Sequence, residues 1–168
     1  MARKEYDTIV RKNGKIYEVD DACIALKWRN FSGENGYEPG KRSFLWCIQD
    51  EETAQYLKDE GFTNVKRKEG EDGSVYWQLE IKVKYNEYGG PKIRVISNGK
   101  RVNITEETAK TLDNISISRI DFDIAPHVDE RKGTQTAYLR GARIVQSESV
   151  SRFDRDDDDY EIIDEVQY

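Results

Sequence analysis

Residues 74–85 are the segment that most constrains the fold. Apolar side chains occupy every second position, and polar or charged side chains occupy the positions between them. Because successive side chains of a β-strand point to opposite faces, this alternation predicts a strand with one buried and one exposed face. Six matched alternations do not fit the period of a helix. The apolar face consists of Val75, Trp77, Leu79, Ile81, Val83 and Tyr85.

Short turn motifs separate further strand-like runs. Asn13-Gly14 and Asn98-Gly99 are dipeptides typical of two-residue hairpins, and the first of them predicts either a small hairpin or a loose arm over residues 1–21. In residues 115–124 the apolar phase slips near Arg119, which predicts a bulge, and Pro126 is expected to end that strand. The other predicted strands cover residues 22–30, 42–48, 62–67, 74–85, 93–97, 101–104 and 134–146.

Two short helices are expected between the strands. Asp50 is a suitable N-cap for residues 51–60, where acidic residues occupy the first turn and Gly61 follows the end. Thr105 is a suitable N-cap for residues 106–112. Six or more strands with tight turns and two helical insertions predict a mainly β fold, a closed or nearly closed antiparallel barrel. An open sheet of this size would leave its edges exposed.

The charge of the chain is unevenly distributed. Residues 154–168 contain eight acidic residues and one basic residue, so they carry a net charge of −7 within a chain whose total is −6. The remaining 153 residues therefore carry +1. Consecutive aspartates repel one another and cannot form a packed core, which predicts a disordered acidic tail over residues 154–168. The acidity of the whole chain is no argument against nucleic-acid binding by the body.

The sequence contains no recognisable catalytic signature. Asp121 and Asp123 share one face of a strand, but no histidine cluster accompanies them, and His127 is the only histidine in the chain. Cys23 and Cys47 lack metal-ligand spacing and are expected to be small buried hydrophobic residues. We expect no enzyme, no metal and no cofactor. The chain has no membrane-length apolar run and no signal peptide, so the expected location is the cytoplasm.

Aromatic and cationic residues recur together on strand faces opposite the apolar ones. A protein that binds single-stranded nucleic acid needs cations to follow the backbone and exposed rings on which bases stack. A solvated barrel exterior would contain some of the same residues, but their recurrence over several strands favours a binding face. The predicted nucleic-acid-binding residues are Arg29, Phe31, Tyr37, Lys41, Arg42, Tyr76, Lys82, Lys84, Arg94, Tyr138 and Arg140.

The acidic tail also contains apolar and aromatic side chains, which a segment serving solubility alone would not need. One hypothesis is that it docks onto a basic, partly apolar groove of a partner protein. A second is that it competes with nucleic acid for the basic face of its own chain, and a third is that it only keeps the protein soluble. The residues assigned to this tail are Asp156, Asp157, Asp158, Asp159, Tyr160, Ile162 and Ile163.

Seven short blocks of the sequence form a recognisable pattern, namely Arg29–Gly33, Gly36–Phe44, Gly61–Val65, Tyr76–Val83, Pro91–Val95, Ile120–Ile124 and Ala137–Arg140. Over roughly residues 22–146 these blocks resemble a family of phage single-stranded DNA-binding proteins with OB-like folds. One departure is Gly40-Lys-Arg-Ser-Phe44, where a more polar or acidic Gly-Asp-Arg-Asn-Phe block is expected, so this chain adds a positive charge there. The resemblance implies a five-stranded OB-like barrel, DNA binding that tolerates any sequence, and a role in phage DNA replication or recombination.

The sequence thus predicts an N-terminal arm or hairpin (1–21), an OB-like domain (22–153) and a tail (154–168). The predicted partners are single-stranded DNA and, through the tail, a replication or recombination protein in the cytoplasm of an infected bacterial host. No membrane partner is expected, and the oligomeric state, a homodimer included, stays open. The alternative function is a protein-interaction module with no nucleic-acid ligand, in which the tail mimics DNA or captures a basic partner.

Overall fold

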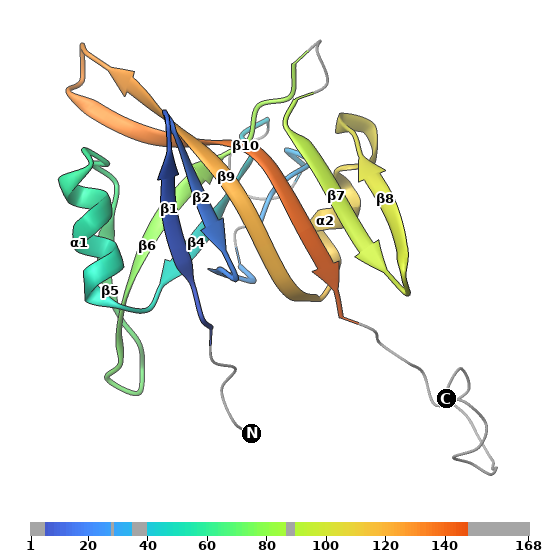
Figure 1. The fold of residues 1–168 in the computed structure, drawn as a ribbon, viewed down its shortest axis with the longest axis horizontal. Helices are drawn as coiled ribbons and strands as arrows, with labels where there is room; N and C mark the ends of the chain where they lie inside the picture. Colours follow the sequence, from blue (N-terminus) through green and yellow to red (C-terminus); the bar gives the residue numbers. More distant parts are fainter. Residues whose placement is uncertain (1–5, 28, 35–39, 87–89, 148–168) are drawn as a thin grey trace.

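A computed structural model describes residues 6–27, 29–34, 40–86 and 90–147 of the chain. Ten strands form one sheet, and two short α-helices lie on opposite sides of it (Figure 1). The fold is therefore mainly β, as predicted. None of the helices in the described residues is long and apolar enough to cross a membrane.

The predicted strand over residues 74–85 forms β6 (Val75–Lys82) at the centre of the sheet. Trp77, Leu79 and Ile81 point into the core, and the residues between them are partly exposed, as the alternation predicted. Two strands flank β6 in antiparallel register, namely β4 (Ser43–Ile48) and the short β5 (Lys66–Glu69).

The long hairpin of β9 (Ile117–Asp129) and β10 (Thr134–Gln146) extends beyond the rest of the sheet (Figure 1). The bulge predicted near Arg119 is confirmed, because Val145 pairs with Arg119 and the next pair joins Gln146 to Ile117. The prediction that Pro126 ends β9 is wrong. Pro126 pairs with Ala137 of β10, whereas β2, on the other side of β9, pairs with it only as far as Ile124. Pro126 therefore lies at an edge of the sheet on that side, and an edge position tolerates a residue without an N–H group.

The N-terminal residues form a hairpin of β1 (Ile9–Asn13) and β2 (Ile16–Asp20), and β2 continues the sheet by pairing with β9. The predicted strand over residues 22–30 is reduced to β3 (Cys23–Ile24) and an isolated bridge between Asn30 and Ser43. A second hairpin, β7 (Lys92–Ser97) and β8 (Lys100–Ile104), joins the sheet through parallel pairing of β7 with β10.

The predicted barrel is not closed. The hydrogen-bonded path runs β1-β2-β9-β10-β6-β4-β3, and its two ends do not pair with each other. The two ends of the path are nevertheless linked by the chain itself, since only Asp21 and Ala22 separate β2 from β3. The sheet therefore curves around one core, which includes Phe44, Trp46 and Phe122 in edge-to-face ring contacts.

The two predicted helices are present. The first, α1 (Glu51–Asp59), begins after Asp50, whose carboxylate accepts a hydrogen bond of 2.8 Å from the backbone N–H of Thr53. It buries Ala54 and Leu57. The second divides into a 3₁₀ turn, Glu106–Thr108, and α2 (Lys110–Asn114), which buries Leu112.

Candidate nucleic-acid interface

Tyr138 lies on the outer face of β10, half-buried between two neighbouring strands. It pairs in register with Ala125 of β9 and with Lys82 of β6. The Lys82 ammonium lies 6.0 Å from the centre of the Tyr138 ring, and His127 contacts the ring edge-on, with 5.3 Å between ring centres. The ring is thus held in position by its neighbours while part of its surface stays open to a ligand.

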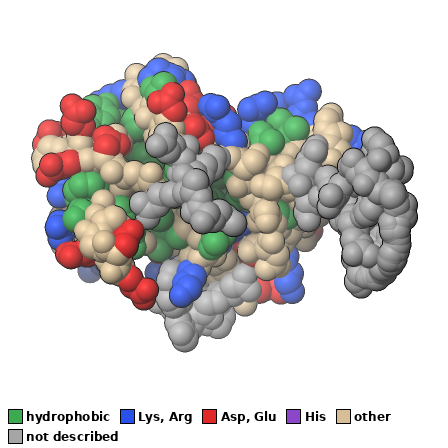
Figure 2. Space-filling view, turned by 90° about the horizontal axis from the view of Figure 1, so that it is seen from below, with side chains coloured by type: hydrophobic (Ala, Val, Ile, Leu, Met, Phe, Trp, Pro, Cys, Tyr) green, Lys and Arg blue, Asp and Glu red, His purple; other side chains and the backbone are tan. Residues whose placement is uncertain are grey.

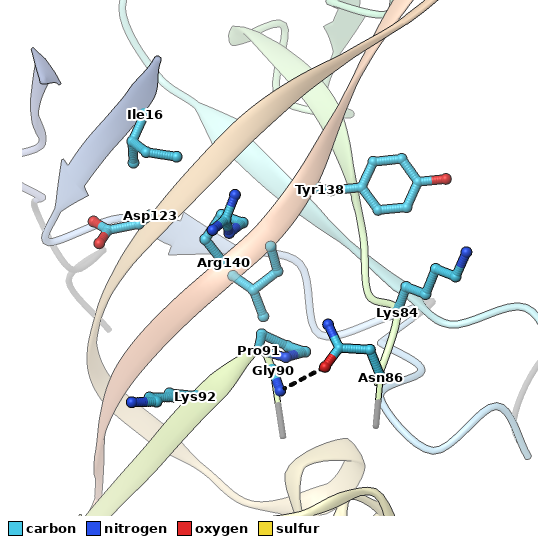
Figure 3. A pocket seen from close by; sticks show the side chains of 10 residues that line it. Ile16, Lys84, Asn86, Gly90, Pro91, Lys92, Asp123, Tyr138 and Arg140 are labelled. Carbon is cyan, nitrogen blue, oxygen red and sulfur yellow. Dashed lines mark hydrogen bonds between the residues drawn. The ribbon is translucent and has the colours of Figure 1, made fainter. Parts of the chain in front are cut away.

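An open pocket of about 750 Å³ begins at Tyr138 and is called the Tyr138 groove below. Figure 3 shows Tyr138 and Lys84 on one side of it and Asp123 and Ile16 on the other, with Arg140 between them. Within the described part of the chain, Lys84 and Arg140 are exposed and form no ion pair, so both charges are available to an anionic ligand. The lining residues are Ile16, Lys84, Asn86, Gly90, Pro91, Lys92, Asp123, Tyr138, Leu139 and Arg140.

The segment after β6 holds Lys84 at the rim of the Tyr138 groove. The backbone N–H of Val83 donates to the carbonyl of Arg42, which extends the pairing of β6 with β4. Asn86 is then tied to Gly90, because its side-chain oxygen accepts a 3.1 Å hydrogen bond from the N–H of Gly90 (Figure 3). Pro91, the next residue, is buried. Lys84 therefore projects from a segment anchored at both ends.

One carboxylate interrupts this basic surface. Burial raises the pKa of Asp123 above its ordinary value, and the nearby carboxylates of Glu18 and Asp20 raise it further. Arg11 acts in the opposite direction but forms its own ion pairs with Glu18 and Asp20. Asp123 thus marks the boundary between the groove and an acidic region on β2 and β9.

Acidic side chains also gather around α1. Figure 2 shows one face of the molecule, on which acidic side chains gather on the side occupied by α1. Asp50, Glu51, Glu52 and Asp59 at or within α1 account for acidic charge there. The surface of α1 itself is therefore poorly suited to phosphate, in contrast to the rim of the Tyr138 groove, whereas β5 beside α1 carries the exposed Lys66, Arg67 and Lys68.

Two of the predicted binding residues are buried, and their predicted roles are wrong. Phe31 has no exposed surface and stacks on Phe44 with 5.0 Å between ring centres, so no base can reach its ring. Arg29 is 5% exposed, and its guanidinium donates hydrogen bonds of 3.2 and 2.7 Å to the carbonyls of Leu112 and Ile115. Burial lowers the pKa of Arg29, and the carboxylate of Asp113 opposes that shift.

Other predicted residues lie apart from the Tyr138 groove. Arg42 forms a 2.8 Å ion pair with Glu106 and lies over the ring of Tyr85. Lys41 is exposed and forms a 3.4 Å ion pair with Glu80. Arg94 is exposed on β7, where Arg143 and Asn103 are its partners in register.

Tyr76 is half-buried on β6, opposite Lys68 of β5. Lys82 lies six positions further along the strand, a distance of about 20 Å at the usual rise of a strand. Tyr76 therefore belongs to the same outer face but not to the Tyr138 groove. Tyr37 and the seven predicted residues of the tail lie outside the described residues.

Sequence reasoning missed several residues that line the groove, among them Ile16, Asn86, Lys92 and Asp123, and it missed His127, which contacts the Tyr138 ring. Because Pro126 was predicted to end β9, His127 fell outside the predicted strand. Continuing β9 through Pro126 would have placed His127 opposite Thr136 in register, beside Tyr138. No signal in the sequence identifies Ile16 or Lys92, because the pairings of β2 with β9 and of β7 with β10 join distant parts of the chain.

A family model described as "Putative phage ssDNA-binding domain" matches residues 7–154. Proteins of this class are defined by binding single-stranded DNA rather than by catalysis. The chain belongs to this family.

Several solved structures of phage proteins are similar to this chain. The single-stranded DNA-binding protein from bacteriophage Enc34 is 12% identical, with a TM-score of 0.48 over 88% of this chain and 89% of that one. The same protein in complex with ssDNA is 15% identical, with a TM-score of 0.47 over 88% and 95%. The protein gp2.5 of bacteriophage T7, a single-stranded DNA-binding protein, is 12% identical, with a TM-score of 0.39 over 92% and 99%. No curated protein sequence matches this chain.

Proposed function

We propose that this protein binds single-stranded DNA without sequence preference during phage DNA replication or recombination, and that the Tyr138 groove is part of its binding site. The observation that carries the proposal is the placement of one partly open aromatic ring among three basic side chains, Lys82, Lys84 and Arg140. The family to which the chain belongs supports the same ligand.

The chemistry of the groove suits a single strand. A base stacked on Tyr138 would contribute about 1–3 kcal/mol, and every base has a face that can stack, so this contact tolerates any sequence. Phosphates on either side of that base would meet Lys84 and Arg140. Each phosphate neutralised on a single strand should steepen the fall of log affinity with log salt concentration by about 0.7.

The strand order supports an OB-like assignment for the fold. If β2 and β3 are taken as one bent strand, that strand pairs with β9 on one side and with β4 on the other. The hydrogen bond of 2.9 Å from the N–H of Ala22 to the carbonyl of Ile120 continues the first of these pairings. OB folds are partly open five-stranded barrels that bind oligonucleotides across strands 2 and 3. Here those strands are β4 and β6, which keeps Lys41 and Tyr76 as proposed contacts.

The test is a titration of the full chain with fluorescent oligo-dT at low salt. We expect Tyr138→Ala to weaken binding by about one to two orders of magnitude, because a stacking platform is lost. Tyr138→Trp should retain the affinity, and Lys58→Gln, on the exposed face of α1, should leave it close to that of the wild type. Unchanged affinity in a correctly folded Tyr138→Ala variant would contradict this assignment of the site.

We further propose that the acidic tail competes with DNA for the basic face or docks a replication partner. A chain ending at residue 153 loses a net charge of −7. We expect this truncation to bind oligo-dT more tightly at low salt. At high salt it should match the full chain, because the charge of the tail is then screened. Equal affinity at low salt would rule out competition. Absence of binding both with and without the tail would favour the interaction-module alternative.

A further inference from the structure

A second hollow lies beside the Tyr138 groove, under the turn of the N-terminal hairpin. Its volume is about 330 Å³, and it is called the hairpin hollow below. Ala125 and Pro126 of β9 and Ile16 of β2 supply apolar surface. Its other lining residues are Lys12, Gly14, Lys15, Tyr17 and Arg140.

The hairpin hollow and the Tyr138 groove share two residues, Arg140 and Ile16. The sheet register explains this continuity. Tyr138 pairs with Ala125, and Ile16 follows in the next strand, one residue from the pair of Tyr17 with Ile124. Since neighbouring strands lie about 4.8 Å apart, Tyr138, Ala125 and Ile16 form a floor about 10 Å wide across three strands.

Arg140 stands above this floor, between the two hollows. It is exposed, it lies two residues after Tyr138 on the same strand, and a register shift between Leu139 and Gly141 occurs at its position. β-bulges of this kind redirect side chains. A phosphate held by Arg140 could therefore connect one nucleotide in the Tyr138 groove to the next in the hairpin hollow.

Of the two lysines in the hairpin hollow, only one is available to a ligand. Lys12 forms an ion pair of 2.9 Å with Glu60 and lies over the ring of Tyr17. Lys15 is exposed at the turn and, among the residues that the structure describes, has no ion-pair partner. Away from the turn, the outer face of β2 becomes acidic at Glu18 and Asp20, so phosphate is favoured only near Lys15.

We propose that the hairpin hollow is a second nucleotide subsite, in which the N-terminal hairpin guides the same DNA strand onward from the Tyr138 groove. Lys15 binds a phosphate there, and the apolar surface of Ile16 and Pro126 contacts a base. This inference rests on the proposed function. It gives a role to residues 9–20, which form a wall of the binding site rather than an accessory arm.

The experiment titrates the full chain with oligo-dT of about twelve nucleotides, a length within what one OB fold covers and enough to occupy both subsites. We expect Lys15→Gln in the full chain to weaken this binding several-fold. The salt dependence of binding should become shallower by about 0.7, which corresponds to one phosphate contact.

The chain supplies a matched control. Lys100 follows Asn98-Gly99 as Lys15 follows Asn13-Gly14, and both lysines are exposed, although Lys15 is a turn residue and Lys100 is the first residue of β8. Lys100→Gln thus removes the same charge beside the other hairpin turn. We expect Lys100→Gln to leave both the affinity and its salt dependence unchanged. If Lys15→Gln behaves as Lys100→Gln does, the second subsite is wrong. Tyr138→Ala must weaken binding, and its failure to do so would overturn the proposed function instead.

Discussion

Two short segments of this protein carry the same pair of residue types at the same spacing. Arg29 and Phe31 are separated by one residue, and so are Tyr138 and Arg140. In the first segment both side chains are buried. In the second, Tyr138 is half-exposed and Arg140 is exposed. The same local chemistry therefore lies in the core in one place and on the surface in the other.

The difference comes from what covers each segment. The carbonyls of Leu112 and Ile115, in and just after α2, accept the hydrogen bonds of Arg29, and the carboxylate of Asp113 accepts the backbone N–H of Phe31. The second segment lies on the outer face of β10, where His127 contacts the Tyr138 ring edge-on and the Lys82 ammonium lies over the ring. A cation near an aromatic ring indicates a nucleic-acid contact only where no other element packs on it.

The comparison is tested most strongly by Phe31→Ala. Removing a fully buried phenylalanine from a packed core typically lowers the free energy of unfolding by about 3–5 kcal/mol, and Phe31 stacks on Phe44 within that core. We expect a loss of this size in urea unfolding, whereas the folded fraction should bind oligo-dT with the affinity of the wild type. Tyr138→Ala should show the opposite behaviour, with a large loss of affinity and a small loss of stability.

The two variants control for each other, because each removes one aromatic ring next to an arginine. If Phe31→Ala keeps its stability and loses affinity, Phe31 acts as a stacking platform after all. The distinction between the two segments would then be wrong.

The local features of the fold could be predicted from the sequence because they depend on neighbouring residues. Alternation placed β6, the Asp50 cap placed α1, and the slip of apolar phase placed the bulge near Arg119. Pro126 misled the prediction because its effect depends on whether the far side of β9 is paired. Whether the barrel closes could not be predicted from the sequence either, since closure depends on how every strand twists and pairs.

The proposed binding site was predictable only in part, for the same reason. Tyr138, Arg140, Lys82 and Lys84 could be found because each lies on the polar face of an alternating strand or just beyond it. Arg29 could not be assigned correctly, because its partners are carbonyls more than 80 residues away in the sequence. The local sequence thus predicts on which face of a strand a side chain lies and what charge it carries. It does not predict whether a distant element buries that side chain.

Asp123→Asn should have the smallest effect and the opposite sign. Asp123 is the one carboxylate that lines the Tyr138 groove among the residues described, and its burial and its acidic neighbours raise its pKa. At neutral pH its charge repels phosphate, so removing that charge should tighten oligo-dT binding by about 0.5 kcal/mol, roughly a doubling of affinity. Because the pKa is raised, Asp123 takes up a proton at a higher pH than an ordinary aspartate does. The wild type should therefore bind DNA more tightly as the pH falls toward that pKa, and Asp123→Asn should lack this part of the pH dependence.

Asp59→Asn, the same change on α1, serves as the control and should keep the pH dependence of the wild type. If the wild type, Asp123→Asn and Asp59→Asn all show the same pH profile, Asp123 lies outside the path of the DNA.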